Sequence, residues 1–158
     1  MTVRLVPLPA AEFSDWLSRS TTEYEADLVV TGVAPEQARA QAERTMSTSF
    51  PAGKPTAMNA VFNIVDRAGT AVGYIWVGKD TSGDPTAWWV WDIAVDPAFR
   101  SQGYARSGMQ LAEDYARKQG AQTLGLNVFG FNAAARGLYE SLGYETTSIK
   151  MRKSLADG

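Results

Sequence analysis

The sequence predicts an α/β fold: one domain around a mixed central sheet of six to seven strands, flanked by four helices. The chain has 158 residues, of which 45% are hydrophobic and 20% charged, as is usual for one globular domain with a buried core. Apolar residues alternate in some segments and recur at helical spacing in others. The order of these segments is strand, two helices, three strands, helix, strand, helix and strand. Such an order mixes antiparallel neighbours with right-handed crossovers.

The N-terminal half is expected to form a short strand, two helices and an antiparallel hairpin. Apolar side chains recur at helical spacing after Pro9, and Gly32 interrupts them before Pro35 opens a second helix. Two alternating segments then flank a turn at 66–70. The expected elements are a strand at 2–8, helices at 9–30 and 35–46, and strands at 57–66 and 71–79.

The C-terminal half alternates strands with helices. Pro97 closes a long strand, and Gly120 and Gly143 are expected to cap two helices. The expected elements are a strand at 86–95, a helix at 101–119, a strand at 123–129, a helix at 132–143 and a final strand at 144–155. This ending is short for two strands, so the last sheet edge is either open or covered by a partner chain, and a homodimer is left open.

Composition excludes several kinds of chemistry. There is no cysteine for a disulfide, a thiol nucleophile or a thiolate metal site, and no histidine, the commonest general base and metal ligand. Proton transfer must therefore use carboxylates, tyrosine, lysine or water. The net charge of −2 gives no reason to expect nucleic acid or a membrane as partner. No signal-peptide pattern and no apolar run near the ~20 residues of a membrane span are present, so a cytoplasmic protein is expected.

The segment RSQGYAR, residues 100–106, is a candidate anion-binding loop between a strand and a helix. A helix N-terminus presents unpaired N–H groups and positive potential to an anion. Gly103 lets phosphate oxygens approach the backbone, and Ala105 keeps the first turn small. Arg100 and Arg106 can add charge-assisted hydrogen bonds. Alone, the segment could be a plain helix start with a glycine; its place after a strand and before an amphipathic helix favours a phosphate cradle.

Two stretches together resemble the GCN5-related N-acetyltransferase (GNAT) superfamily. IAVDPAFRSQGYA fits its cofactor motif, Arg/Gln-x-x-Gly-x-Gly/Ala after a strand, and NVFGFNAAARGLYESLGY fits its second motif, an Asn that opens a helix with a Tyr seven residues later. Within the superfamily, the chain is similar to a bacterial group without an assigned substrate. The resemblance implies a single acetyltransferase domain over 1–158, with 1–87 mainly on the acceptor side and 88–153 as the cofactor-binding half.

The resemblance implies acetyl-CoA as cosubstrate and no metal. The backbone of Ile93, Ala94 and Val95 would pair with the pantetheine arm, on a strand that splays from its parallel neighbour, and a bulge there would give an N–H that polarises the thioester carbonyl. Asn132 would bond the pantetheine amide, or serve only as a helix N-cap. The implied pyrophosphate contacts are Arg100, Ser101, Gln102, Gly103, Tyr104, Ala105 and Arg106.

The catalytic candidates are Tyr139 and Asp92. Tyr139 lies seven residues after Asn132, on the same helix face and ~10 Å further along, and is implied to protonate the leaving thiolate; its alternative is packing. Some relatives carry a Glu that acts as the general base at the position of Asn127 in this chain. The resemblance therefore transfers the role of base to Asp92, directly or through water. The alternative is a strand carboxylate satisfied by an arginine or a backbone N–H.

Strand alternation predicts which side chains accompany Asp92. It places Asp92 and Ala94 on one face, together with Trp88, and Ile93 with Val95 on the other. The face that carries Asp92 is therefore the expected acceptor side.

The expected function is acetyl-CoA-dependent N-acetyl transfer to a small-molecule or peptide amine by direct attack. Acidic residues in the N-terminal half favour a cationic amine, although a solvated helix face also explains them: Glu23, Glu25, Asp27 and Glu36. Two alternatives remain, a catalytically silent acyl-CoA-binding or sensing module on the same fold, and an acyltransferase that uses a longer acyl-CoA.

Overall fold

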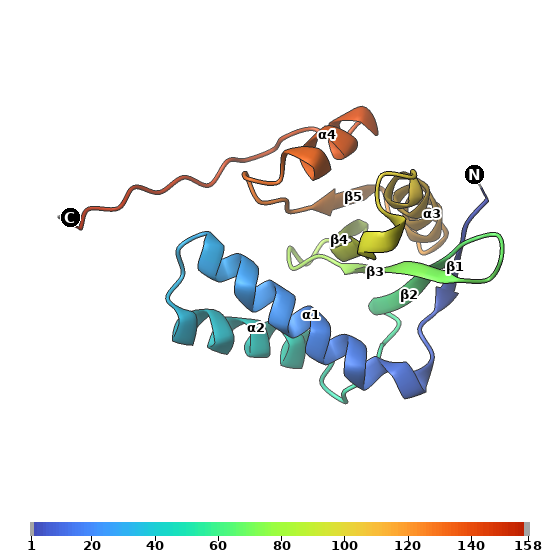
Figure 1. Ribbon diagram of the computed structural model, residues 1–158, viewed down its shortest axis with the longest axis horizontal. Helices are drawn as coiled ribbons and strands as arrows, with labels where there is room; N and C mark the ends of the chain where they lie inside the picture. The colour runs from blue at the N-terminus through green and yellow to red at the C-terminus, as the bar shows by residue number, and fades with distance from the viewer. Residues whose placement is uncertain (1, 157–158) are drawn as a thin grey trace.

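A five-stranded mixed sheet with helices on both faces forms the centre of the computed structural model, which describes residues 2–156 (Figure 1). Strands β1 to β4 pair antiparallel in chain order, and β4 pairs with β5 in parallel. The strands are β1 (Arg4–Pro7), β2 (Asn59–Val65), β3 (Ala71–Lys79), β4 (Ala87–Val95) and β5 (Thr123–Leu126). The helices are α1 (Ala10–Val30), α2 (Pro35–Ser49), α3 (Tyr104–Lys118) and α4 (Ala133–Ser141), with a short 3-10 helix η1 (Pro97–Phe99) before α3. The α/β class and the four helices are confirmed.

The strand count of six to seven is wrong for the described residues. The segment expected as a final strand at 144–155 forms none, and the strand expected at 123–129 ends at Leu126. Residues 145–156 instead run as an extended, exposed segment towards the end of α1, where Arg152 Nη1 donates to the Gly32 carbonyl at 3.0 Å (Figure 1). The alternating pattern of this segment is typical of a strand. A strand also needs a neighbouring strand for its backbone hydrogen bonds, and this segment has none among residues 2–156.

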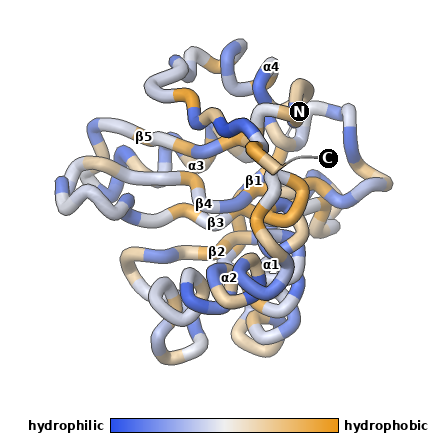
Figure 2. Tube along the Cα trace, turned by 90° about the vertical axis from the view of Figure 1, so that its left-hand side faces the viewer, coloured by the Kyte–Doolittle hydropathy of each residue, from blue (hydrophilic) through white to orange (hydrophobic). Residues whose placement is uncertain are grey.

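An aromatic cluster packs α1 and α2 on one face of the sheet. Trp16 of α1 meets Tyr74 and Trp76 of β3 edge-on, with ring centroids 5.7 and 5.8 Å apart. Phe50, just after α2, lies 4.9 Å from Trp76. Figure 2 shows hydrophilic stretches along α1 and α2. The cluster fixes α1 over the middle of the sheet.

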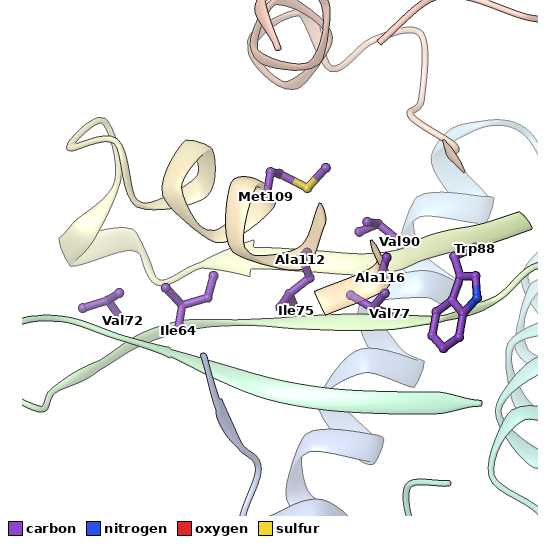
Figure 3. Close-up of a cluster of buried hydrophobic side chains, with 9 residues drawn as sticks. All are labelled: Ile64, Val72, Ile75, Val77, Trp88, Val90, Met109, Ala112 and Ala116. Atoms are coloured by element: carbon purple, nitrogen blue, oxygen red, sulfur yellow. The ribbon is translucent and has the colours of Figure 1, made fainter. Parts of the chain in front are cut away.

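Helix α3 covers the opposite face with small and flexible side chains. Met109, Ala112 and Ala116 pack against Ile64 of β2 and Ile75 of β3 (Figure 3). Strand β3 lies between the two helical layers, so every residue from 72 to 78 is buried. This explains its nearly continuous apolar run.

A β-bulge in β4 changes which of its side chains share a face. The register passes from Val77 opposite Val90 to Trp76 opposite Asp92, so Trp91 is the extra residue. The prediction that Trp88 accompanies Asp92 is therefore wrong: Trp88 packs against α3, whereas Asp92 faces α1. After the bulge the expected alternation holds, since Ala94 packs on the α1 side and Ile93 on the α3 side.

Candidate active site

The two parallel strands part at one end of the sheet. Their last paired residues are Val90 and Leu126, yet β4 continues to Val95 with β3 as its one strand neighbour in the described chain. An open pocket of about 330 Å³ lies beside β4, between the β3–β4 loop and the residue that follows β5, and is lined by Asp80, Thr81, Ser82, Trp89, Trp91 and Asn127. Ile93, Ala94 and Val95 lie on the unpaired edge. An extended ligand with amide groups can pair with such an edge as an added strand does.

The segment at 100–106 forms the turn that leads into α3. Ser101 has φ 63° and Gly103 has φ 88°, both left-handed, and Gly103 is the N-cap of α3. Ser107 N donates to the Gly103 carbonyl as the first helical hydrogen bond. Within residues 2–156 the amides of Tyr104, Ala105 and Arg106 meet no acceptor, as expected for the first turn of a helix. These free N–H groups and the absent Cβ at Gly103 fit an anionic group such as a pyrophosphate.

The three long polar side chains of this loop have partners within the protein. Arg100 Nε donates to the Val95 carbonyl at 3.0 Å and ties the loop to the end of β4. Arg106 Nη2 donates to Ser141 Oγ at 2.6 Å and ties α3 to α4. Gln102 Nε2 donates weakly to the Ala98 carbonyl at 3.5 Å. The arginines thus shape the fork, and their anion contacts stay a prediction.

Asp92 is held by two hydroxyl groups on the α1 side of β4. Ser20 Oγ donates to Asp92 Oδ2 at 2.7 Å, and Tyr74 Oη donates to the same oxygen at 2.8 Å. Burial raises the pKa of Asp92 above its usual range; the charges of Glu23 and Asp27 act in the same direction, while the two hydrogen bonds oppose them. A carboxyl group with a raised pKa beside an open fork is suited to accept a proton.

Tyr139 approaches the fork from α4. Its half-buried ring packs against Tyr144, with centroids 6.1 Å apart, and against the α3-side core. Burial raises the pKa of Tyr139, and the charge of Asp92 raises it further, so the hydroxyl keeps its proton at neutral pH. Tyr139 packs on the α3 side of the sheet, whereas Asp92 faces α1, so their joint action in one site stays a prediction. Tyr144 instead donates to Glu113 Oε2 at 2.8 Å, consistent with a packing role.

Asn132 is the N-cap of α4. Its Oδ1 accepts from Ala135 N at 3.2 Å, which gives it the ordinary role of a capping residue. Its side chain is exposed, and a contact with the pantetheine amide stays a prediction.

The sequence alone did not identify Ser20 and Tyr74 as partners of Asp92. The sequence holds a hint of each. Ser20 is a polar residue on the apolar helix face that contains Phe13 and Trp16, and Tyr74 places a hydroxyl in a buried strand. The contact of Tyr74 with Glu23, 3.1 Å from Oη to Oε2, was equally unforeseen.

Within residues 2–156, no three or more histidine, cysteine, aspartate and glutamate side chains are arranged to hold a metal ion. None of the helices described is long and apolar enough to cross a membrane.

Residues 12–144 match the model of the acetyltransferase (GNAT) family. The chain belongs to this family. This GNAT protein is an N-acetyltransferase, and its family uses acyl-CoA. It is 28% identical over 156 residues to the uncharacterized N-acetyltransferase YycN of Bacillus subtilis, covering 98% of this chain and 100% of YycN. The crystal structure of YycN superposes with a TM-score of 0.89 at 27% identity, covering 99% of this chain and 100% of YycN.

Two further proteins resemble this GNAT protein, one over part of the chain and one over nearly all of it. The ribosomal protein bS18 alanine N-acetyltransferase of Escherichia coli K12 is 43% identical over 61 residues, which is 39% of this chain and 41% of that enzyme. A structure of AAC(6')-Iy with a bisubstrate analogue, CoA-S-monomethyl-acetylneamine, has a TM-score of 0.61 at 16% identity and covers 98% of this chain and 99% of that one. The latter likeness shows a shared fold.

Proposed function

We propose that this protein transfers an acetyl group from acetyl-CoA to a cationic primary amine by direct attack of the amine. The observation that carries the proposal is Asp92, a carboxyl group with a raised pKa that two hydroxyls hold at the end of an open strand edge.

The proposed cofactor site extends from this edge to the start of α3. The segment at 100–106 would hold the pyrophosphate, the backbone of Ile93–Val95 would pair with the pantetheine arm, and Asn132 would bond its amide. Acetyl-CoA, when bound, supplies the acyl group as an activated thioester. A backbone N–H near Val95 is the proposed donor to the thioester carbonyl.

Two residues of the chain would move protons. Asp92 accepts the proton of the attacking amine, directly or through a water molecule, and its raised pKa supports this role. Tyr139 donates its hydroxyl proton to the leaving thiolate, and its own raised pKa keeps that proton available at neutral pH.

The acceptor would be a small-molecule or peptide amine that approaches from the α1 side. Glu23 and Asp27 lie close enough to Asp92 for their charges to raise its pKa, and the same charges attract an ammonium group. Residues 1–87 would supply most of this side and 88–153 the cofactor half. The AAC(6')-Iy structure holds a neamine-derived analogue, which is consistent with an amine-binding site on this fold.

We also propose that the exposed segment at 145–156 pairs with the sheet edge of a second copy. Ile149, Met151 and Leu155 lie on one side of this extended segment and are 72%, 84% and 85% exposed, and β5 has a free edge among residues 2–156. Light scattering on a column should find a dimer that Ile149→Lys together with Met151→Lys converts to a folded monomer. A monomeric parent protein would refute this pairing.

The direct test is release of free thiol from acetyl-CoA with a panel of polyamines, amino acids, aminoglycosides and peptides. We expect turnover with cationic amines, and less with succinyl- or propionyl-CoA. Turnover with a longer acyl-CoA in preference would favour that alternative. Tight acetyl-CoA binding without turnover on any amine would favour a silent acyl-CoA-binding module. Asn127 supports this alternative, because some relatives have a Glu that acts as the general base at its position.

A further inference from the structure

We propose that Tyr74 and Glu23 carry the amine proton from Asp92 to solvent. The proposal rests on the acetyl transfer proposed above, since it concerns the proton that Asp92 receives in that reaction.

One hydroxyl group joins two carboxyl groups here. Tyr74 Oη lies 2.8 Å from Asp92 Oδ2 and 3.1 Å from Glu23 Oε2. A phenol has a single proton, so Tyr74 can donate to one of these oxygens at a time. While Asp92 is ionised, Tyr74 and Ser20 both donate to Oδ2. Once Oδ2 carries a proton, it becomes a donor, and Tyr74 is free to donate to Glu23 instead.

The outer end of this chain of groups reaches solvent, whereas its middle is buried. Tyr74 is 2% exposed, whereas the side chain of Glu23 is 48% exposed. Asp92 is half-buried beneath α1, and an amine bound for attack would cover the face that remains open. The route through Tyr74 ends at the exposed carboxylate of Glu23, from which a proton can pass to water.

Each step of the proton transfer breaks one bond to hydrogen and forms another. The amine N–H bond breaks as the Asp92 Oδ2–H bond forms. The Oδ2 proton then passes to Tyr74 Oη while the original Tyr74 proton passes to Glu23 Oε2, and Glu23 releases it to water. Tyr74 is neutral before and after the transfer. Burial and the neighbouring carboxylates raise the pKa of Tyr74, which is consistent with a route that avoids a free tyrosinate.

Arg19 orients the outer end of this route. Its Nε donates to Glu23 Oε1 at 3.2 Å, which leaves Oε2 towards Tyr74, and its Nη2 donates to Asp96 Oδ1 at 3.2 Å. The guanidinium also lies 5.1 Å from the centre of the Tyr74 ring. The other charged or titratable groups that act on Asp92 are Asp27 of α1 and Tyr139 of α4.

The test compares Tyr74→Phe and Glu23→Gln with the parent protein. Phenylalanine keeps the ring against Trp16, and Glu23 is on the surface, so both variants should fold. We expect kcat to fall about tenfold in each, with the KM for acetyl-CoA unchanged, because proton exit is impaired. Added formate, a small proton acceptor, should restore part of the Glu23→Gln rate. Glu43→Gln, the same change at an exposed position of α2, should keep the parent rate and show no rescue.

The pH profiles of the two variants should move in opposite directions. Tyr74→Phe removes a hydrogen bond that lowers the pKa of Asp92, so the acid limb of the profile should shift to higher pH. Glu23→Gln removes a charge that raises this pKa, so the acid limb should shift to lower pH. These shifts would show that both groups act on Asp92, whereas the fall in kcat and its rescue by formate test the proton route itself.

A titration without substrate provides an independent readout. Carbon-13 NMR of the free protein should show the Asp92 and Glu23 carboxyl carbons each sensing the protonation of the other, and Tyr74→Phe should weaken that coupling. Uncoupled carboxyls, or variants that keep the parent kcat and the parent pH profile, would overturn the proton route through Tyr74 and Glu23 and leave the proposed acetyl transfer untouched. Absence of turnover with every amine would overturn the amine-proton role together with the proposed acetyl transfer, even where the carboxyls remain coupled.

Discussion

Replacing Asp92 by asparagine should separate catalysis from stability. The asparagine Oδ1 can accept the hydrogen bonds that Ser20 Oγ and Tyr74 Oη now give to Asp92 Oδ2 at 2.7 and 2.8 Å, so the local geometry is retained. The amide cannot take up the amine proton. Loss of a general base lowers the rate by about 10²–10⁴-fold, which corresponds to about 3–5 kcal/mol in the activation barrier.

The stability of the same variant should move in the other direction. Because the folded protein raises the pKa of Asp92, the folded state binds the proton more tightly than the unfolded chain does. Stability contributed by this group is therefore lost as the pH rises from the unfolded pKa of Asp92 through its raised folded pKa, and the cost is largest above both values. Asparagine carries no such cost, so Tm at pH 7 should equal or exceed that of the parent, and the advantage should shrink towards acid pH.

Thermal unfolding by circular dichroism at neutral and acid pH, with thiol release under the same conditions, measures both effects. Asp114→Asn is the matched control, since Asp114 is exposed and pairs with Arg117 at 2.8 Å on the surface of α3. It should change stability by about 0–1 kcal/mol at most and leave turnover intact. Parent-like turnover of Asp92→Asn would refute the role of base. A marked loss of Tm would show that the carboxylate supports the fold instead.

Three other substitutions test separate parts of the site. Tyr139→Phe should lower kcat about 10²-fold or more by removing the general acid, and thiol-release kinetics with Tm unchanged would distinguish this from unfolding. Gly103→Ala should cost about 1–2 kcal/mol of strain at φ 88° and weaken acetyl-CoA binding in calorimetry, whereas an unchanged Kd would exclude the loop as the phosphate site. Gly125→Ala places a Cβ 2.3 Å from the Trp89 ring, so Tm should fall by an amount equivalent to about 1–3 kcal/mol; an unchanged Tm would show that Trp89 moves aside freely.

Local patterns predicted the elements of the fold well, because each depends on residues close in sequence. The spacing of apolar side chains placed the helices, and the turn at 66–70 joins two antiparallel strands as expected. The final strand was wrong because its pairing depends on a neighbour that a local pattern cannot reveal. The bulge at Trp91 was missed for a related reason: it is a property of the register between β3 and β4, and a single strand shows only regular alternation.

In the candidate site, too, local motifs predicted some residues, whereas others come together only through tertiary packing. The positions of Gly103, Asn132 and Tyr139 follow from short motifs that open α3 and α4. The hydroxyls that hold Asp92 come from Ser20 and Tyr74, which lie 72 and 18 residues away in the chain. Only the packing of α1 and β3 against β4 brings them together, so no local pattern could identify them.

The most direct test of the central claim is mass spectrometry of cationic amines incubated with this protein and acetyl-CoA, with free thiol measured in parallel. We expect an amine product that carries one acetyl group, formed in equal amount to the released thiol by the parent protein and nearly abolished in Asp92→Asn. Bound acetyl-CoA with no acetylated product from any amine, or equal product from the parent and from Asp92→Asn, would contradict it.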